Sequence, residues 1–150
     1  MKREFVKRLP KEIIERIISY TYEFQDKQML EDIRNFIETR KTILTLYRTF
    51  WIDTWNECEL EDKNWLINDL HAYSNNYKAS MYGYVENFYS ILKRNYLLKT
   101  KTDEELDNSI RIIDRKNVQT QINIFLGLFF PKERNDIIIF ITNMINKHPR

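Results

Sequence analysis

Few residues of this 150-residue chain have side chains suited to catalysis, and they lie far apart in the sequence. His71 and His148 are the only histidines, and Cys58 is the only cysteine. A nucleophile–histidine site would need one of these imidazoles, and the three residues lack the spacing of metal ligands. The two glycines, Gly83 and Gly127, stand alone and form no phosphate-binding loop. We therefore expect no enzyme activity, no cofactor and no metal site.

A cluster of cations is the next set of residues with recognisable chemistry. Between Lys93 and Lys101 the chain carries four cations and no acid: Lys93, Arg94, Lys99 and Lys101. Cations interleaved with aromatics such as Tyr89 and Tyr96 can hold phosphates and stack bases. Alternatively, the first two cations stabilise a helix C-terminus through its dipole, and the tyrosines belong to the core. We favour this alternative and keep nucleic-acid contact as a hypothesis.

Composition narrows the class of protein. The 24 basic and 22 acidic residues leave a net charge of +2, which provides no general attraction to nucleic acid or to a membrane surface. No stretch approaches the ~20 apolar residues of a membrane span. The first residues are charged and no apolar segment follows them, so we expect a protein that is not secreted. One cysteine excludes an internal disulfide.

The elements that must position these residues are predicted to be helices. The sparse glycines and prolines and the apolar spacing indicate a single all-α domain over residues 1–150, with seven or eight helices. Helix starts are marked by Asp26, by Thr102 with Glu105, by Asn117 and by Pro131. We expect helices over 10–22, 27–55 with an interruption at 38–42, 63–73 and 77–98, and from 103, 117 and 131 onward.

Two apolar segments need a closer look. Residues 137–141 favour a strand by composition, but the helical start before them and the apolar residues after them favour a helix. In residues 27–55 the spacing of three, four and seven predicts one inward stripe. Its members are Leu30, Ile33, Ile37, Leu44, Tyr47 and Trp51.

An aliphatic helix near the start of the chain is the strongest local pattern. Pro10 suits a first helical position, because its missing N–H costs nothing there. Ile13, Ile14, Ile17 and Ile18 follow on one face. A face this apolar needs a partner, which is either the rest of the chain or another protein.

This segment resembles the opening of an F-box, the short helical motif that docks on the Skp-type adaptor of ubiquitin ligases. The resemblance rests on Leu9-Pro10-x-Glu12-Ile13-Ile14-x-x-Ile17-Ile18-Ser19-Tyr20, and Trp51 stands about where a tryptophan closes the motif. Residues 26–36 depart from the leucine-rich middle of the family. The resemblance implies an F-box-like segment over about 9–51. Its protein-interface residues would be Leu9, Pro10, Ile13, Ile14, Ile17, Ile18, Tyr20 and Trp51.

Residues 30–39 and 122–136 resemble a group of small helical proteins encoded by large nucleocytoplasmic DNA viruses. The 20 isoleucines, against 3 valines, agree with an A/T-rich genome. The resemblance implies a non-catalytic viral interaction or structural protein, such as a minor capsid component, in the virion or the host cytoplasm. Its partners would be other virion or capsid proteins. The alternatives are an F-box-like adaptor that docks a Skp-type subunit and, second, a nucleic-acid-binding helical protein.

Overall fold

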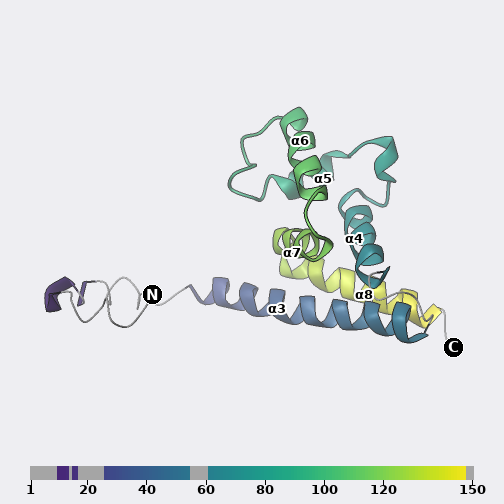
Figure 1. Ribbon diagram of the computed structural model, residues 1–150, viewed down its shortest axis with the longest axis horizontal. Helices are drawn as coiled ribbons and strands as arrows, with labels where there is room; N and C mark the ends of the chain where they lie inside the picture. Colours follow the sequence, from purple (N-terminus) through teal and green to yellow (C-terminus); the bar gives the residue numbers. More distant parts are fainter. Residues whose placement is uncertain (1–9, 14, 17–25, 55–60, 148–150) are drawn as a thin grey trace. The chain divides into compact units, whose positions relative to one another are not determined.

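The computed structural model describes residues 10–13, 15–16, 26–54 and 61–147 (Figure 1). Within these ranges helices are the only regular elements, so the predicted all-α class is confirmed. The elements are α3 (Lys27–Tyr47), the π-helix η1 (Arg48–Thr54), α4 (Glu61–Ser74), the 3₁₀ turn η2 (Ser80–Tyr82), α5 (Glu86–Leu92), α6 (Asp103–Asp114), α7 (Val118–Leu128) and α8 (Pro131–Lys147). None of the described helices combines the length and apolar character that crossing a bilayer requires.

The contacts along the chain group its residues into two compact units, Met1–Glu31 and Asp32–Arg150. The F-box-like segment expected over residues 9–51 has residues in both units. One domain over residues 1–150 stays a prediction.

The first unit has a helical turn where the aliphatic segment begins. Residues 11–13 and 15–16 are helical, and the Ile13 N–H donates to the Pro10 carbonyl at 3.0 Å. Further along, the Asp26 carboxylate accepts from the Gln28 N–H at 2.9 Å, as expected of a residue that caps α3.

Local signals at the other helix starts are confirmed. Thr102 and Glu105 form a reciprocal capping box at α6, and the Asn117 side chain accepts from the Thr120 N–H at the start of α7. Pro131 is the first residue of α8. Residues 137–141 lie inside α8, so the expectation of a helix rather than a strand is confirmed.

The prediction of one helix over residues 77–98 is wrong. The structure has η2 and α5 there, separated by extended residues and followed by turns. Asn76 and Tyr77 have positive φ angles of 52° and 58°, and Gly83 has 86°, so the backbone leaves the helical region twice. The buried Asn75 side chain holds this loop: it donates to the carbonyls of residues 78 and 83 and accepts from the Val85 N–H at 2.8 Å.

The prediction for residues 27–55 also needs correction. No interruption occurs at 38–42, because α3 is continuous to Tyr47 and the chain goes on as η1. The inward stripe was wrong at Ile33 and Ile37, which are exposed. Arg40, inside the polar patch that was expected to break the helix, donates instead to the Asn123 side chain of α7 at 2.7 Å.

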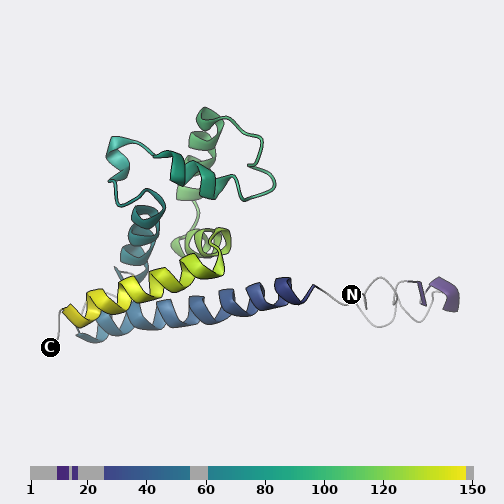
Figure 2. The same ribbon diagram turned by 180° about the vertical axis from the view of Figure 1, so that it is seen from behind.

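The second unit is built around α4 and α7, which pack most extensively against each other. In both views α8 lies along α3 and runs in the same direction (Figures 1 and 2). The buried core comprises Ile43, Tyr47, Leu66, Ile67, Leu70, Phe88, Ile91, Leu92, Leu106, Ile110, Ile113, Ile122, Phe125, Leu126, Phe129, Ile137 and Ile141.

A buried arginine joins three of these helices. Arg134 of α8 is 1% exposed. Its guanidinium donates to the Leu126 carbonyl at 2.8 Å, to the Asp32 carboxylate at 2.7 Å and to the Asn35 side chain at 3.0 Å. A buried charge needs such a full set of partners, so this contact sets where α8 begins its path along α3.

Candidate interaction surface

Apolar residues occupy two different faces of α3. One face packs into the second unit through Phe36, Ile43 and Tyr47, of which the last two are 0% and 1% exposed. Ile33 and Ile37 lie beside this face, about 60° and 100° around the helix from Phe36, because each residue advances an α-helix by about 100°. Their side chains are 43% and 57% exposed. We call Ile33 and Ile37 the outer face of α3.

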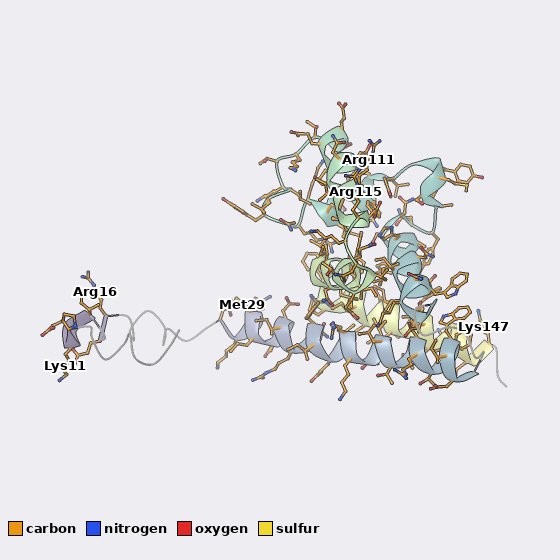
Figure 3. The ribbon with its side chains drawn as sticks, viewed as in Figure 1. Lys11, Arg16, Met29, Arg111, Arg115 and Lys147 are labelled. Carbon is orange, nitrogen blue, oxygen red and sulfur yellow. The ribbon has the colours of Figure 1, made fainter. Side chains whose placement is uncertain are left out.

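Polar residues border the outer face. Arg34, Glu38 and Lys41 are exposed on the same helix. Met29, one turn before Ile33 in α3, is 49% exposed and projects from the helix (Figure 3). Exposed aliphatic side chains with a polar rim are typical of surfaces that contact another molecule.

The structure describes only part of the predicted N-terminal interface. Pro10 is exposed, and Ile13 is 43% exposed. The other N-terminal members lie outside the described residues: Leu9, Ile14, Ile17, Ile18 and Tyr20.

Trp51 has a packing role in the second unit. Its ring stacks on Trp65 of α4 with centroids 4.9 Å apart, and meets the Phe50 ring edge-on at 5.0 Å. Among the described residues, nothing accepts a hydrogen bond from its buried Nε1. Trp51 therefore joins η1 to α4.

The four predicted nucleic-acid contacts have different surroundings. Lys93 pairs with Asp103 at 3.0 Å. Arg94 forms a two-pronged ion pair with Glu133, with Nη2 donating at 2.9 Å, and its guanidinium lies 4.1 Å from the centre of the Phe130 ring. Lys101 donates to the Ser109 hydroxyl at 3.1 Å, while Lys99 is exposed.

The pair of Arg94 and Glu133 is a structural link at the start of α8. Burial alone raises the pKa of Glu133, but hydrogen bonds from Arg94 and from the Phe130 N–H, with the charge of Arg94, bring it below its ordinary value. Arg94 also donates to the Leu128 carbonyl at 3.0 Å. This guanidinium is already neutralised, so it has little left to offer a phosphate.

His71 is a packing residue. Its ring lies 4.5 Å from that of Phe125 and 5.8 Å from that of Phe88, centre to centre. Burial lowers its pKa, and the charge of Asp114 acts in the opposite direction. Within the described ranges, no group of three or more His, Cys, Asp or Glu residues could hold a metal ion.

Exposed aromatic residues at a second place were missed from the sequence. Tyr77 is 60% exposed and its ring lies 5.6 Å from that of Phe140 in α8, which is 38% exposed. Tyr82 is 70% exposed. Tyr96 is 88% exposed, so the favoured expectation that it belongs to the core is wrong. The available signal was Asn75-Asn76 followed by Gly83, a spacing that indicates a turn and breaks the helix that would have carried these rings inward.

Comparison with known proteins leaves the family open: no protein-family model matches this chain, no curated protein matches it, and no solved structure matches it.

Proposed function

We propose that this protein is a non-catalytic protein-interaction protein that binds a partner along the outer face of α3. The observation that carries the proposal is the second apolar face of this helix. An amphipathic helix needs one apolar face to join a core, and α3 uses Phe36, Ile43 and Tyr47 for that purpose. Ile33 and Ile37 are additional to that need, and because each is about half exposed, burying it against a partner stabilises a complex by about 1 kcal/mol.

We further propose that the partner is a virion or capsid protein and that the protein is a minor structural component of a large DNA virus. The resemblance of residues 30–39 to small viral helical proteins supports this proposal, and the outer face lies within that segment. The alternative is an F-box-like adaptor for a Skp-type subunit. The exposed Pro10 and Ile13 favour this alternative, whereas the packing of Trp51 on Trp65 does not.

The test is affinity purification of the tagged protein from its native source, with mass spectrometry of the proteins that accompany it. Four forms are compared: the wild type, an Ile33→Asp/Ile37→Asp variant, an Ile13→Asp variant and an Ile112→Asp control. Ile112 lies on α6 and is 59% exposed, so its substitution matches the outer-face change in chemistry and exposure.

Recovery of capsid proteins with the wild type and the control, and their loss from the Ile33→Asp/Ile37→Asp variant, supports the proposal. If the wild type recovers a Skp-type subunit and a cullin, and the Ile13→Asp variant loses both, the adaptor alternative replaces the proposal. The same set of partners with all four forms shows that the outer face of α3 is not the contact surface.

A further inference from the structure

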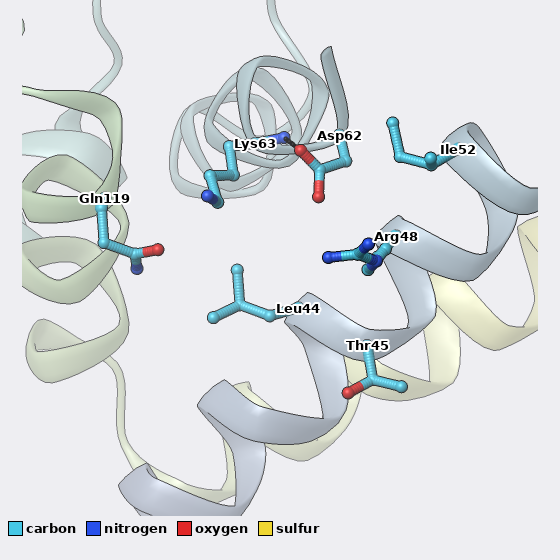
Figure 4. Close-up of a pocket in the computed structure, with 7 residues that line it drawn as sticks. All are labelled: Leu44, Thr45, Arg48, Ile52, Asp62, Lys63 and Gln119. Carbon is cyan, nitrogen blue, oxygen red and sulfur yellow. Dashed lines mark hydrogen bonds between the residues drawn. The ribbon is translucent and has the colours of Figure 1, made fainter. Parts of the chain in front are cut away.

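A cleft of about 330 Å³ lies where the end of α3 and η1 face α4 and α7 (Figure 4). Leu44 and Ile52 are its apolar residues, and the Gln119 side chain from α7 forms the wall opposite them. The volume falls at the lower end of the range that holds small ligands. The π-helix supplies both Arg48 and Ile52, and π-helical turns occur frequently at functional sites.

Two cations of the cleft have no partner among the residues that the structure describes. The Arg48 guanidinium and the Lys63 ammonium both point into the space between the helices (Figure 4). Neither group makes a hydrogen bond or ion pair with another described residue. Elsewhere in the unit Lys93, Arg94 and Arg134 are all paired with carboxylates. Two unpaired cations that converge on one cavity form a site for an anion, and the fork of an arginine suits a phosphate.

The cleft also contains one acceptor. Asp62 is only 6% exposed, and one of its carboxylate oxygens accepts from the Lys63 N–H at 2.7 Å. The other oxygen points into the cleft, and no described residue donates to it (Figure 4). A carboxylate oxygen that faces a cleft accepts hydrogen bonds, and a hydroxyl group of a ligand can donate one.

We propose that this cleft binds a small hydroxylated phosphate ester. Its phosphate lies between Arg48 and Lys63, and a hydroxyl group donates to Asp62. The two cations exceed the one carboxylate, so the site favours a ligand that is anionic overall. The proposal concerns a different place from the outer face of α3 and does not depend on the partner that binds there.

The test is calorimetric titration of the full-length protein at constant ionic strength, with glycerol 3-phosphate, inorganic phosphate and glycerol as probes. We expect saturable binding of both phosphates, tighter for the ester, and no binding of glycerol. Arg48→Gln and Lys63→Gln should each weaken binding about tenfold or more, because each removes a charge-assisted hydrogen bond. Lys41→Gln is the matched control: it removes an exposed cation of α3 that does not line the cleft, and binding should not change.

Asp62→Asn tests the second contact. The loss of its negative charge should tighten the binding of inorganic phosphate, while the preference for the ester over inorganic phosphate should fall. Urea unfolding midpoints equal to the wild type show that each variant is folded.

The proposal is overturned if neither phosphate binds saturably, or if Arg48→Gln and Lys63→Gln behave like Lys41→Gln. It is also overturned if a single-stranded oligonucleotide without terminal phosphates binds through Arg48 and Lys63 more tightly than the ester. That result would make the cleft a contact for a nucleic-acid backbone.

Discussion

The two apolar faces of α3 are built from the same kinds of side chain and have different surroundings. Ile43 is completely buried, and Ile37, less than two turns earlier, is 57% exposed. Both residues lie well inside a helix that runs from Lys27 to Tyr47. The difference shows that apolar spacing establishes a helix but not which of its faces the rest of the chain will cover.

The cause of the difference is the position of α8. Arg134 contacts Asp32 and Asn35 at the start of the path of α8 along α3. Asp32, Phe36 and Ile43 follow one another at helical spacing, so they share the face that α8 and the core cover. Ile33 is about 100° further around the helix than Asp32 and lies at the edge of this contact, where it stays 43% exposed. A polar anchor thereby selects which apolar face becomes core.

An aspartate placed on each face of α3 gives the strongest test of the difference between the two faces. Ile43→Asp should destabilise the protein by more than about 4 kcal/mol, because it puts a charge in a fully buried position. Ile37→Asp should change the free energy of unfolding by no more than about 0.5 kcal/mol. Urea unfolding followed by circular dichroism measures both. Equal losses would mean that the outer face is part of a core.

A second experiment tests the polar anchor. Arg134→Met should cost about 2 kcal/mol, because it leaves the Leu126 carbonyl and the Asn35 side chain without their donor. The effect is smaller than that of a lone buried charge, since the Asp32 side chain is 48% exposed and regains water. Arg34→Met, the same substitution at an exposed position of α3, is the control and should be nearly neutral. If the two variants unfold at the same urea concentration, Arg134 does not select the face.

The smallest expected effect is a pH dependence of stability that arises where Tyr47, at the end of α3, contacts Asp69. The Tyr47 hydroxyl donates to the Asp69 carboxylate, and burial raises the pKa of Asp69 although this hydrogen bond lowers it. The folded state therefore holds this proton more tightly than the unfolded chain. The resulting stability is present in full below the ordinary pKa of 3.8 and is lost as the pH rises through the folded-state pKa.

The measurement is the difference in unfolding free energy between the wild type and Asp69→Asn at several pH values. The wild type should lose stability relative to the variant as the pH rises from about 3 to about 7. The Tyr47 hydroxyl keeps an acceptor in the variant, so the hydrogen bond itself is not the variable. A constant difference across this range would show that folding does not raise the pKa of Asp69.

Features that depend on neighbouring residues could be predicted from the sequence. The capping box of Thr102 and Glu105, the cap at Asn117 and the proline at the start of α8 act within one helical turn, so residue type and spacing specify them. Asn75 and Asn76 indicate where the loop after α4 begins, but not how far it extends. It depends on the buried Asn75 side chain, which reaches Gly83 and Val85 across the turn.

The candidate sites were predictable only in part. Lys93 and Arg94 are visible in the sequence as cations, but their partners Asp103 and Glu133 lie on α6 and α8 and are brought near by folding. Arg48 and Lys63 gave no signal, because they are separated in the sequence and converge on one cleft only where η1 meets α4.

The sequence by itself determined that this chain forms helices and where most of them begin, because helix formation and capping are governed by residues within a few positions of one another. The tertiary structure alone decided which face of α3 is buried and which cations are neutralised. Both outcomes depend on contacts such as that of Arg134 with Asp32, whose partners are distant along the chain. A charge or an aliphatic side chain contributes to stability only where folding brings a partner to it. Without such a partner the side chain stays in water.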